Sequence, residues 1–302
     1  MKIGLIFPGQ GSQAVGMGKD FYDNTQIGKE IFNKADDILG YSLSDLCFEG
    51  PIEELSKTIN TQPALFTVSV IAGFVAKEKG LCPSVYAGHS AGEYAALCCA
   101  GAFSFEDGLK LIAKRASFMT ECGAKNPGKM AAVLNLDYEK IKEIIGSIKG
   151  ICVAANINSL VQTVISGEES AVDEAMEKCK EAGAKRVVPL NVSGGFHSPL
   201  MKDAQDKLKE EIGNISFNKI DVPVIANFTA KPETDPGEIK DNLIKQITGS
   251  VRWVETCQEF VSMGIEKVYE CGAGSVLCGL VKKTTPEIES AKITVMSDFD
   301  NL

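Results

Sequence analysis

Short apolar runs that alternate with helical patterns constrain the fold of this chain more than any other feature. The runs expected to form buried strands are Ile3–Phe7, Val85–Ala87, Val224–Phe228, Lys267–Glu270 and Ile293–Met296, and the helical patterns between them include Ala64–Lys79, Phe105–Cys122, Leu200–Ile212 and Val251–Met263. Strands separated by helices favour an α/β fold, because a helical crossover returns the chain to start a parallel neighbour. We therefore expect a mostly parallel sheet.

Residues 125–193 break this alternation. After the turn-like sequence Asn126-Pro127-Gly128, the elements follow in the order β-α-β-β-α-β, which is that of a ferredoxin-like unit. The strands are Met130–Leu134, Ile151–Ile157, Gln162–Ser166 and Arg186–Val192, and the helices are Tyr138–Ile148 and Ala171–Ala182. We expect residues 125–193 to form an insert with its own small sheet, and residues 1–124 and 194–302 to form the larger body. A cleft between two such lobes is a common ligand site.

Charge and apolar content narrow the class of protein. The 302 residues include 31 Lys and Arg against 40 Asp and Glu, which gives a formal charge of −9. This balance disfavours nucleic-acid binding, which needs a broad basic surface, but a local basic patch could still hold an acidic partner. The longest apolar stretch, Pro63–Ala76, is too short for a bilayer span, and the segment before Pro8 is too short for a secretory signal. We expect a cytoplasmic protein whose ten cysteines are mostly small core residues.

Histidine and arginine are scarce, which limits the candidates for chemistry. His89 and His197 are the two histidines, and the three arginines are Arg115, Arg186 and Arg252. Two histidines exclude a multi-histidine metal site, and the lack of a C-x-x-C pair argues against a structural zinc. No metal is therefore expected, and a histidine base has two candidates.

The motif Gly88-His89-Ser90-Ala91-Gly92 fits G-x-S-x-G. It stands between an expected strand and a helical pattern over residues 93–100, which is the context of a serine nucleophile elbow. The glycines allow a sharp reversal that exposes Ser90 at the start of a helix, where the dipole and free N–H groups favour an oxyanion. A chance glycine-rich turn is the alternative, and the context favours the nucleophile.

Two histidines compete as the base for Ser90. Adjacent residues on such a turn generally point apart, which disfavours His89. His197 lies on a glycine-rich loop just before Ser198, a candidate N-cap, and Pro199, a candidate first helical residue. The positive end of that helix should favour the neutral imidazole, which is the form that acts as a base. A loop histidine without a chemical role is the alternative.

Arg115 lies in the helical pattern that Ser104 is expected to cap, but away from its polar face. Its neighbours three and four positions away are all apolar: Leu111, Ile112, Phe118 and Met119. A guanidinium aimed at the core is costly unless a carboxylate or phosphate meets it, and its fork binds a carboxylate bidentately. The partner could be a substrate carboxylate or an internal acid, or the side chain could reach water. The residues alone leave these readings open.

A glycine-rich loop, Gly9-Gln10-Gly11-Ser12-Gln13-Ala14, follows the first strand and fits the G-x-G-x-x-A pattern of dinucleotide-binding loops. Pro8 interrupts the junction, Gly16 and Gly18 weaken the following helix, and no acidic strand end follows at the required spacing. These features disfavour a nicotinamide cofactor. The loop is better suited to presenting a backbone N–H to Ser90.

Taken together, these motifs resemble the malonyl-CoA:acyl carrier protein transacylases, the acyltransferases of bacterial fatty-acid synthesis. The matching segments follow the family's order and span nearly the whole chain: Phe7–Gln13, Gly88–Glu93, Lys114-Arg115, Val164–Gly167, Phe196–Met201, Gln246, Val251–Trp253 and Glu270–Leu280. The resemblance implies an α/β-hydrolase-like core with a ferredoxin-like insert. The chain departs from the family pattern at three places. Ala91 stands where leucine is common, Ser250 replaces a common proline, and residues 156–162 lack the usual proline.

The resemblance implies a role for each matched residue. Ser90 would carry the malonyl ester, His197 would act as general base and then general acid, and Arg115 would bind the free malonate carboxylate. Gln246 would join Arg115 at the substrate site and support His197 through its main-chain carbonyl. The backbone N–H groups that would form the oxyanion hole belong to Gln10 and Ala91.

The implied reaction is a ping-pong transfer from malonyl-CoA to the phosphopantetheine thiol of acyl carrier protein, with no metal and no redox cofactor. We expect a monomer that binds neither nucleic acid nor membrane. Lys185-Arg186 and Lys282-Lys283 are candidate basic clusters for the acidic carrier protein, although each could equally be a solvated face. The alternatives are a polyketide-type acyltransferase, a serine hydrolase of acyl thioesters, a dehydrogenase and a non-catalytic binding module.

Overall fold

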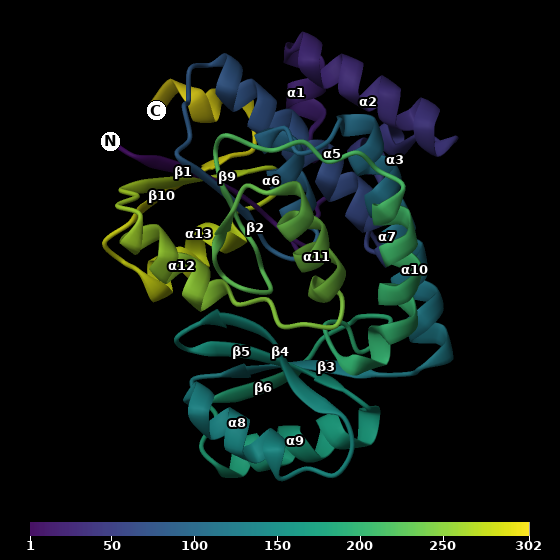
Figure 1. Cartoon of the computed structure of the whole chain (residues 1–302), viewed down its shortest axis with the longest axis vertical. Helices are drawn as coiled ribbons and strands as arrows, with labels where there is room; N and C mark the ends of the chain where they lie inside the picture. The colour runs from purple at the N-terminus through teal and green to yellow at the C-terminus, as the bar shows by residue number, and fades with distance from the viewer. Residues whose placement is uncertain (302) are drawn as a thin grey trace.

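The computed structural model describes residues 1–301 and contains a six-stranded and a four-stranded sheet (Figure 1). The larger sheet has the order β10-β9-β1-β2-β7-β8, and its strands are β1 (Ile3–Phe7), β2 (Val85–Gly88), β7 (Val224–Ile225), β8 (Pro232–Glu233), β9 (Lys267–Cys271) and β10 (Glu289–Ile293). Every neighbouring pair is parallel except β7 and β8. The predicted mixed α/β class with a mostly parallel sheet is confirmed.

Helices cover both faces of the larger sheet because alternate residues of β1 point to opposite sides. Leu5 and Phe7 join a core with α5, α6 and α7, whereas Ile6 joins a second core with α12 and α13. The helices of this body are α1 (Lys19–Asn24), α2 (Gln26–Leu39), α3 (Leu43–Glu49), α4 (Ile52–Leu55), α5 (Thr58–Glu78), α6 (Gly92–Ala100), α7 (Phe105–Lys125), α10 (Lys202–Gly213), α11 (Pro236–Gln246), α12 (Trp253–Ser262) and α13 (Val276–Thr284).

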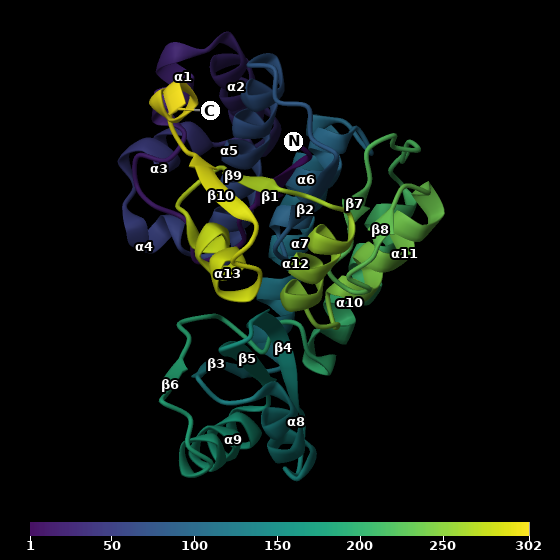
Figure 2. The same ribbon diagram turned by 90° about the vertical axis from the view of Figure 1, so that its left-hand side faces the viewer.

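The smaller sheet is antiparallel and has the order β4-β5-β3-β6. Its elements are β3 (Lys129–Leu134), α8 (Tyr138–Gly146), β4 (Cys152–Ser159), β5 (Gln162–Gly167), α9 (Glu169–Glu181) and β6 (Arg186–Pro189). Both views place this sheet between the larger body and the helices α8 and α9 (Figures 1 and 2). The β-α-β-β-α-β order predicted from the sequence is therefore observed.

Main-chain hydrogen bonds join the smaller sheet to the larger body just before the start of α12. The N–H of Val251 donates to Ala155 O at 2.8 Å, and the N–H of Ile157 donates to Val251 O at 2.9 Å. The pairing of β4 with β5 shifts register beside Ala155, which leaves the Ala155 carbonyl for this contact. Ser250 adds a side-chain bond, because its hydroxyl donates to Ala154 O at 2.6 Å. The serine that replaces a common proline therefore ties the smaller sheet to the body.

Several boundaries differ from the sequence prediction. The last strand is Glu289–Ile293 rather than Ile293–Met296, because the Asp298 carboxylate accepts hydrogen bonds from the N–H groups of Thr294 and Val295 and turns the chain. The run Val224–Phe228 is a strand only as far as Ile225, since a turn closes from Ala226 to Ala230.

Helix α5 is longer than predicted, because it begins at Thr58 and includes Pro63. By length and composition it could cross a membrane, contrary to the expectation from Pro63–Ala76. However, 83% of its most apolar window is buried inside the protein. Apolar residues surround the whole helix, which is typical of a central core helix.

Candidate active site

Ser90 lies in a tight turn between β2 and α6, with a backbone φ of 51°. The two flanking glycines are required by close contacts. A Cβ on Gly88 would lie 2.0 Å from the Gly92 carbonyl carbon, and a Cβ on Gly92 would lie 2.1 Å from the Phe7 carbonyl oxygen. The strand-turn-helix geometry predicted from the motif is observed, and it places Ser90 at the carboxyl end of a central parallel strand.

Asn227 fixes this turn from the loop just after the neighbouring strand β7. Its Oδ1 accepts a hydrogen bond from the N–H of Ser90 at 2.7 Å, and its Nδ2 donates to Gly88 O at 2.6 Å. The side chain is fully buried. No sequence motif marks Asn227. Its place just after a strand that pairs with β2 was a usable signal, because the carboxyl ends of parallel strands meet at one edge of a sheet.

The structure brings His197 to Ser90, from 107 residues away along the chain. The His197 Nε2 and Ser90 Oγ atoms are 2.7 Å apart, and Nδ1 lies 2.9 Å from Gln246 O and 3.1 Å from Gly249 O. Carbonyl oxygens can only accept, so Nδ1 carries the proton and the Nε2 lone pair faces the serine hydroxyl. Ser198 caps the following turn as predicted, with its Oγ accepting from Leu200 N.

The pKa of His197 is lowered to about 3, mainly by burial and then by the charge of Arg115. The predicted neutral imidazole is therefore favoured, but for a different reason than the helix dipole. The segment after His197 begins with a single 3₁₀ turn, Pro199–Met201, rather than directly with a long helix. Low dielectric and a nearby positive charge both oppose the charged imidazolium.

His89 lines the same cavity as Ser90, but its side chain is hydrogen-bonded to the smaller sheet rather than to the serine hydroxyl. Its Nε2 is hydrogen-bonded to Asn158 Oδ1 at 2.8 Å, and its ring centroid is 5.7 Å from that of Trp253. The prediction that adjacent residues on the turn diverge is consistent with this placement. His89 thereby connects the elbow to β4 of the smaller sheet.

Arg115 projects from α7 toward Ser90 and is 1% exposed. Its Nη1 donates to Gln62 Oε1 at 2.6 Å, and its Nη2 donates both to Ser90 Oγ and to Gln246 Oε1 at 3.0 Å. The Nε–H of Arg115 has no partner among residues 1–301. An internal acid and an escape to water were two of the readings left open by the sequence. The side chain neither reaches water nor forms an ion pair with an Asp or Glu of the described chain.

Ser90 and His197 line a cavity of about 100 Å³, and Arg115 donates to two of its lining residues, Ser90 and Gln62, without being part of the lining itself. The cavity is lined by Gln10, Gln62, His89, Ser90, Ala91, Met119, Met130, Asn156, Leu190, Val192, Phe196 and His197. The backbone N–H groups of Gln10 and Ala91 donate no hydrogen bond within the described part of the chain, so they are free to bind an oxyanion beside Ser90. The arrangement supplies a nucleophile, a base, two free donors and a buried cation.

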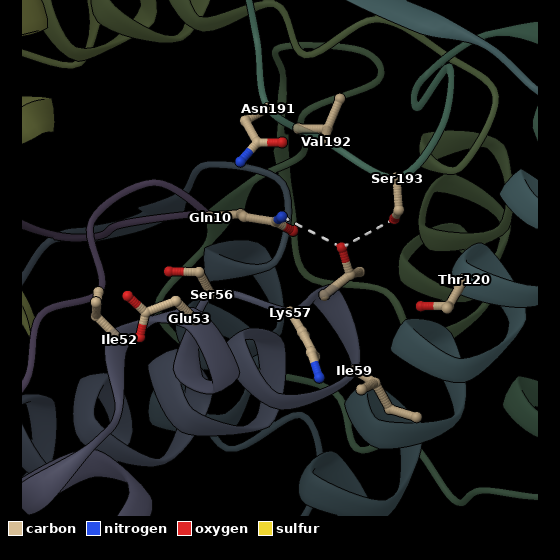
Figure 3. A pocket seen from close by; sticks show the side chains of 11 residues that line it. Gln10, Ile52, Glu53, Ser56, Lys57, Ile59, Thr120, Asn191, Val192 and Ser193 are labelled. Atoms are coloured by element: carbon tan, nitrogen blue, oxygen red, sulfur yellow. Dashed lines mark hydrogen bonds between the residues drawn. The ribbon is translucent and has the colours of Figure 1, made fainter.

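A larger groove of about 550 Å³ adjoins this cavity and shares Gln10 and Val192 with it. Hydrogen bonds that connect Gln10 Nε2, Thr58 Oγ1 and Ser193 Oγ cross the groove (Figure 3). Its remaining lining comes from α4 and the turn after it, from the start of α5, from Thr120 of α7 and from the segment that returns from the smaller sheet. The cavity at Ser90 is therefore continuous in its lining with a larger groove.

Comparisons with known proteins agree with this geometry. A family model described as the acyl transferase domain matches residues 5–297. The chain belongs to the acyl transferase family. The malonyl CoA-acyl carrier protein transacylase of Bacillus subtilis (strain 168) is 43% identical over 296 residues, which are 97% of this chain and 93% of that relative.

Solved structures give the same result. The acyl carrier protein S-malonyltransferase of Vibrio cholerae has a TM-score of 0.96 at 40% identity, and the match covers 100% of this chain and 99% of that one. A malonyl-transacylase solved in complex with its type II PKS acyl-carrier protein has a TM-score of 0.96 at 38% identity and covers 100% and 98% of the two chains.

Within this acyltransferase, Gln246 is fully buried and lies behind the cavity rather than in its lining. Its Nε2 donates to Ser90 O at 3.0 Å and to Glu93 Oε2 at 2.7 Å, while its carbonyl accepts from His197. Burial raises the pKa of Glu93 to about 7. Gln246 thus contacts nucleophile, base and Arg115 at once, which suits a positioning residue.

The two basic clusters lie at different places on the acyltransferase. Lys185-Arg186 is exposed at the start of β6, and Lys282-Lys283 is exposed in the last turn of α13. Neither cluster contributes to the cavity or the groove described above. The structure therefore leaves both as surface positions without a contact to the serine.

Proposed function

We propose that this chain transfers a malonyl group from malonyl-CoA to the phosphopantetheine thiol of acyl carrier protein, for fatty-acid biosynthesis. The observation that carries the proposal is a hydrogen-bonded serine and histidine beside a buried arginine that has no acidic partner among residues 1–301. A nucleophile and base are suited to acyl transfer, and the uncompensated cation selects an acyl group that carries a carboxylate. The names of the relatives support the same reaction.

Acylation begins when Ser90 Oγ attacks the thioester carbonyl and its proton passes to His197 Nε2. The carbonyl oxygen becomes an oxyanion held by the N–H groups of Gln10 and Ala91. The carbon–sulfur bond then breaks, and His197 returns the proton to the leaving CoA thiolate. The pantetheine thiol of the carrier protein repeats these steps in reverse order and takes the malonyl group from Ser90.

Arg115 sets the preference for malonate. In the free protein its Nη2 is 3.0 Å from Ser90 Oγ, which places the cation beside the oxygen that would carry the acyl group. A malonyl carboxylate can pair with it, whereas an acetyl group leaves the charge buried and unpaired. Such an unpaired charge costs roughly 3–5 kcal/mol relative to the paired one.

We also propose how the chain divides into a body and an insert. Residues 1–124 and 194–302 constitute an α/β-hydrolase-like body and residues 125–193 a ferredoxin-like insert, which the observed element order and strand order support. The protein is a cytoplasmic monomer that uses no metal or redox cofactor and binds neither nucleic acid nor membrane. Ten free cysteines support a reducing compartment.

Intact-mass measurement tests the proposal directly. After incubation with malonyl-CoA, the wild-type chain should gain one malonyl mass and the Ser90→Ala variant none. Addition of holo carrier protein should remove the mass from the enzyme and place it on the carrier, whether the carrier belongs to a fatty-acid or a type II polyketide system. Release of free malonate with no transfer to the thiol would instead indicate a hydrolase, and absence of any adduct would contradict the proposal.

A further inference from the structure

Arg115 is surrounded by neutral oxygens. All three of its hydrogen-bond acceptors, Gln62 Oε1, Ser90 Oγ and Gln246 Oε1, are uncharged. Another arginine of the chain, Arg252, does form an ion pair, with Glu255. The acid nearest along the network, Glu93, reaches Arg115 only through the Gln246 amide. The two amides therefore accept hydrogen bonds from the guanidinium without neutralising its charge.

Of these two amides, Gln62 is the one that faces the acyl cavity. It projects from α5, is 1% exposed, and lines the cavity together with Ser90 and His197, whereas Gln246 does not. The Nε2 of Gln62 has a single partner within residues 1–301, the Met119 thioether sulfur at 3.6 Å. A thioether is a weak acceptor, so this buried amide retains a strong donor that the protein does not satisfy well.

We propose that Gln62 is a specificity-determining residue that keeps Arg115 available for the substrate. In the free protein its Oε1 holds Nη1 of Arg115. When a malonyl group enters, its carboxylate receives hydrogen bonds from the guanidinium and from Gln62 Nε2. Hydrogen bonds between ionised groups are stronger than those to a neutral amide, so the substrate carboxylate competes successfully for the guanidinium. This inference rests on the proposed function.

The amide is essential to this arrangement because both obvious replacements fail. A carboxylate at this position would pair permanently with Arg115 and repel the carboxylate of malonate. An aliphatic side chain would leave Nη1 without its partner and remove the second donor. Gln62→Glu therefore tests the charge, and Gln62→Met tests the hydrogen bonds at nearly constant volume. Asn156→Asp is the matched control, because it places a new carboxylate in the same cavity, from β4, at a residue that is not hydrogen-bonded to Arg115.

The experiment measures serine acylation by malonyl-CoA and by acetyl-CoA, together with thermal unfolding, for these variants and for Arg115→Ala. In Gln62→Glu, malonyl acylation should fall about 100-fold or more, as in Arg115→Ala, while acetyl acylation falls less than about tenfold. The midpoint of thermal unfolding should rise, because a buried unpaired cation gains a partner. Gln62→Met should lower malonyl acylation mainly through a higher KM. Asn156→Asp should change the malonyl-to-acetyl ratio less and should not raise the midpoint.

Equal losses of malonyl and acetyl acylation in Gln62→Glu, with a lower unfolding midpoint, would show that Gln62 only supports the fold and would overturn the inference. Unchanged preference for malonyl in both Gln62 variants would also overturn it. These outcomes differ from failure of the proposed function, in which the wild-type chain itself would form no malonyl adduct.

Discussion

Ser90 and His197 both adopt left-handed backbone conformations, with φ of 51° and 54°. Such conformations are costly for residues with a side chain and persist only when the surroundings enforce them. Here the constraint comes from hydrogen bonds: Asn227 holds the serine turn, and the carbonyls of Gln246 and Gly249 hold the imidazole. The reacting atoms therefore stay 2.7 Å apart without direct help from a carboxylate.

Burial of neutral His197 predicts a specific dependence of stability on pH. The folded pKa of His197 is about 3, whereas the unfolded value is near 6.5. Between these values the unfolded chain binds a proton that the folded chain does not, so the stabilising contribution is present above pH 6.5 and is lost as the pH falls toward 3. From pH 7.5 to pH 5.0 the wild-type free energy of unfolding should fall by about 2 kcal/mol more than that of His197→Asn.

Urea unfolding at the two pH values measures this difference. The other titrating groups are common to both proteins, so they cancel in the comparison. Equal losses of stability in the wild type and in His197→Asn would mean that the folded imidazole can be protonated near its ordinary pKa.

At the residue scale, the sequence indicated residues that the structure brings together around Ser90, but not the groups that hold them. Ser90, His197 and Arg115 could be found because rare residue types and a glycine motif mark them. Gln62 and Asn227 are common polar residues in apolar surroundings, and their importance depends on which distant atoms they meet. That information lies in the packing of α5 and β7 against the elbow, which no local pattern encodes.

At the scale of elements, the crossing of β1, the elbow and α6 depends on the absence of side chains at two glycines. In Gly92→Ala the new methyl group would lie 2.1 Å from the carbonyl oxygen of Phe7, in the middle of the parallel sheet. We expect this variant to lose more than about 3 kcal/mol of stability, because neither backbone can move without breaking the sheet.

Gly279→Ala is the matched control for chemical denaturation. Gly279 is exposed within α13, and a Cβ there would have no atom within 4 Å. Alanine should stabilise this helix by about 0.5–1 kcal/mol. Similar destabilisation by both substitutions would contradict the close packing at the elbow.

The boundaries of helices and strands were predictable where local residues such as a helix cap set them. They were not predictable where tertiary contacts set them. Ser104 does cap α7, because its hydroxyl accepts from the N–H of Asp107 at 3.1 Å. By contrast, the early start of α5 at Thr58 depends on packing that tolerates Pro63 in its second turn, and the shift of β10 depends on Asp298. Local propensity alone could not decide these cases.

At the scale of the whole molecule, the solvent exposure of the cysteines shows how completely the two lobes are packed. Cys82 is exposed, Cys278 is partly exposed, and the other eight are buried. Burial raises the pKa of buried thiols such as Cys257, to about 12, so they are both inaccessible and unreactive. One thiol should react rapidly with a maleimide in the native protein, and all ten should react in denaturant.

Mass spectrometry of the labelled protein counts these thiols. Cys82→Ser should abolish the rapid phase of labelling. In denaturant, the number of labelled cysteines should fall only from ten to nine. Rapid labelling of several cysteines in Cys82→Ser would show that the cores of the two lobes open to solvent in the native state.

One short segment, residues 246–251, contacts both His197 and the smaller lobe. Gln246 and Gly249 supply the carbonyls that orient His197, and Ser250 and Val251 bond to β4 of the smaller sheet. A rotation of the smaller lobe would therefore displace the same backbone segment that orients the imidazole of His197. A carrier protein that bound both lobes and shifted one against the other would therefore change the alignment of His197 with Ser90.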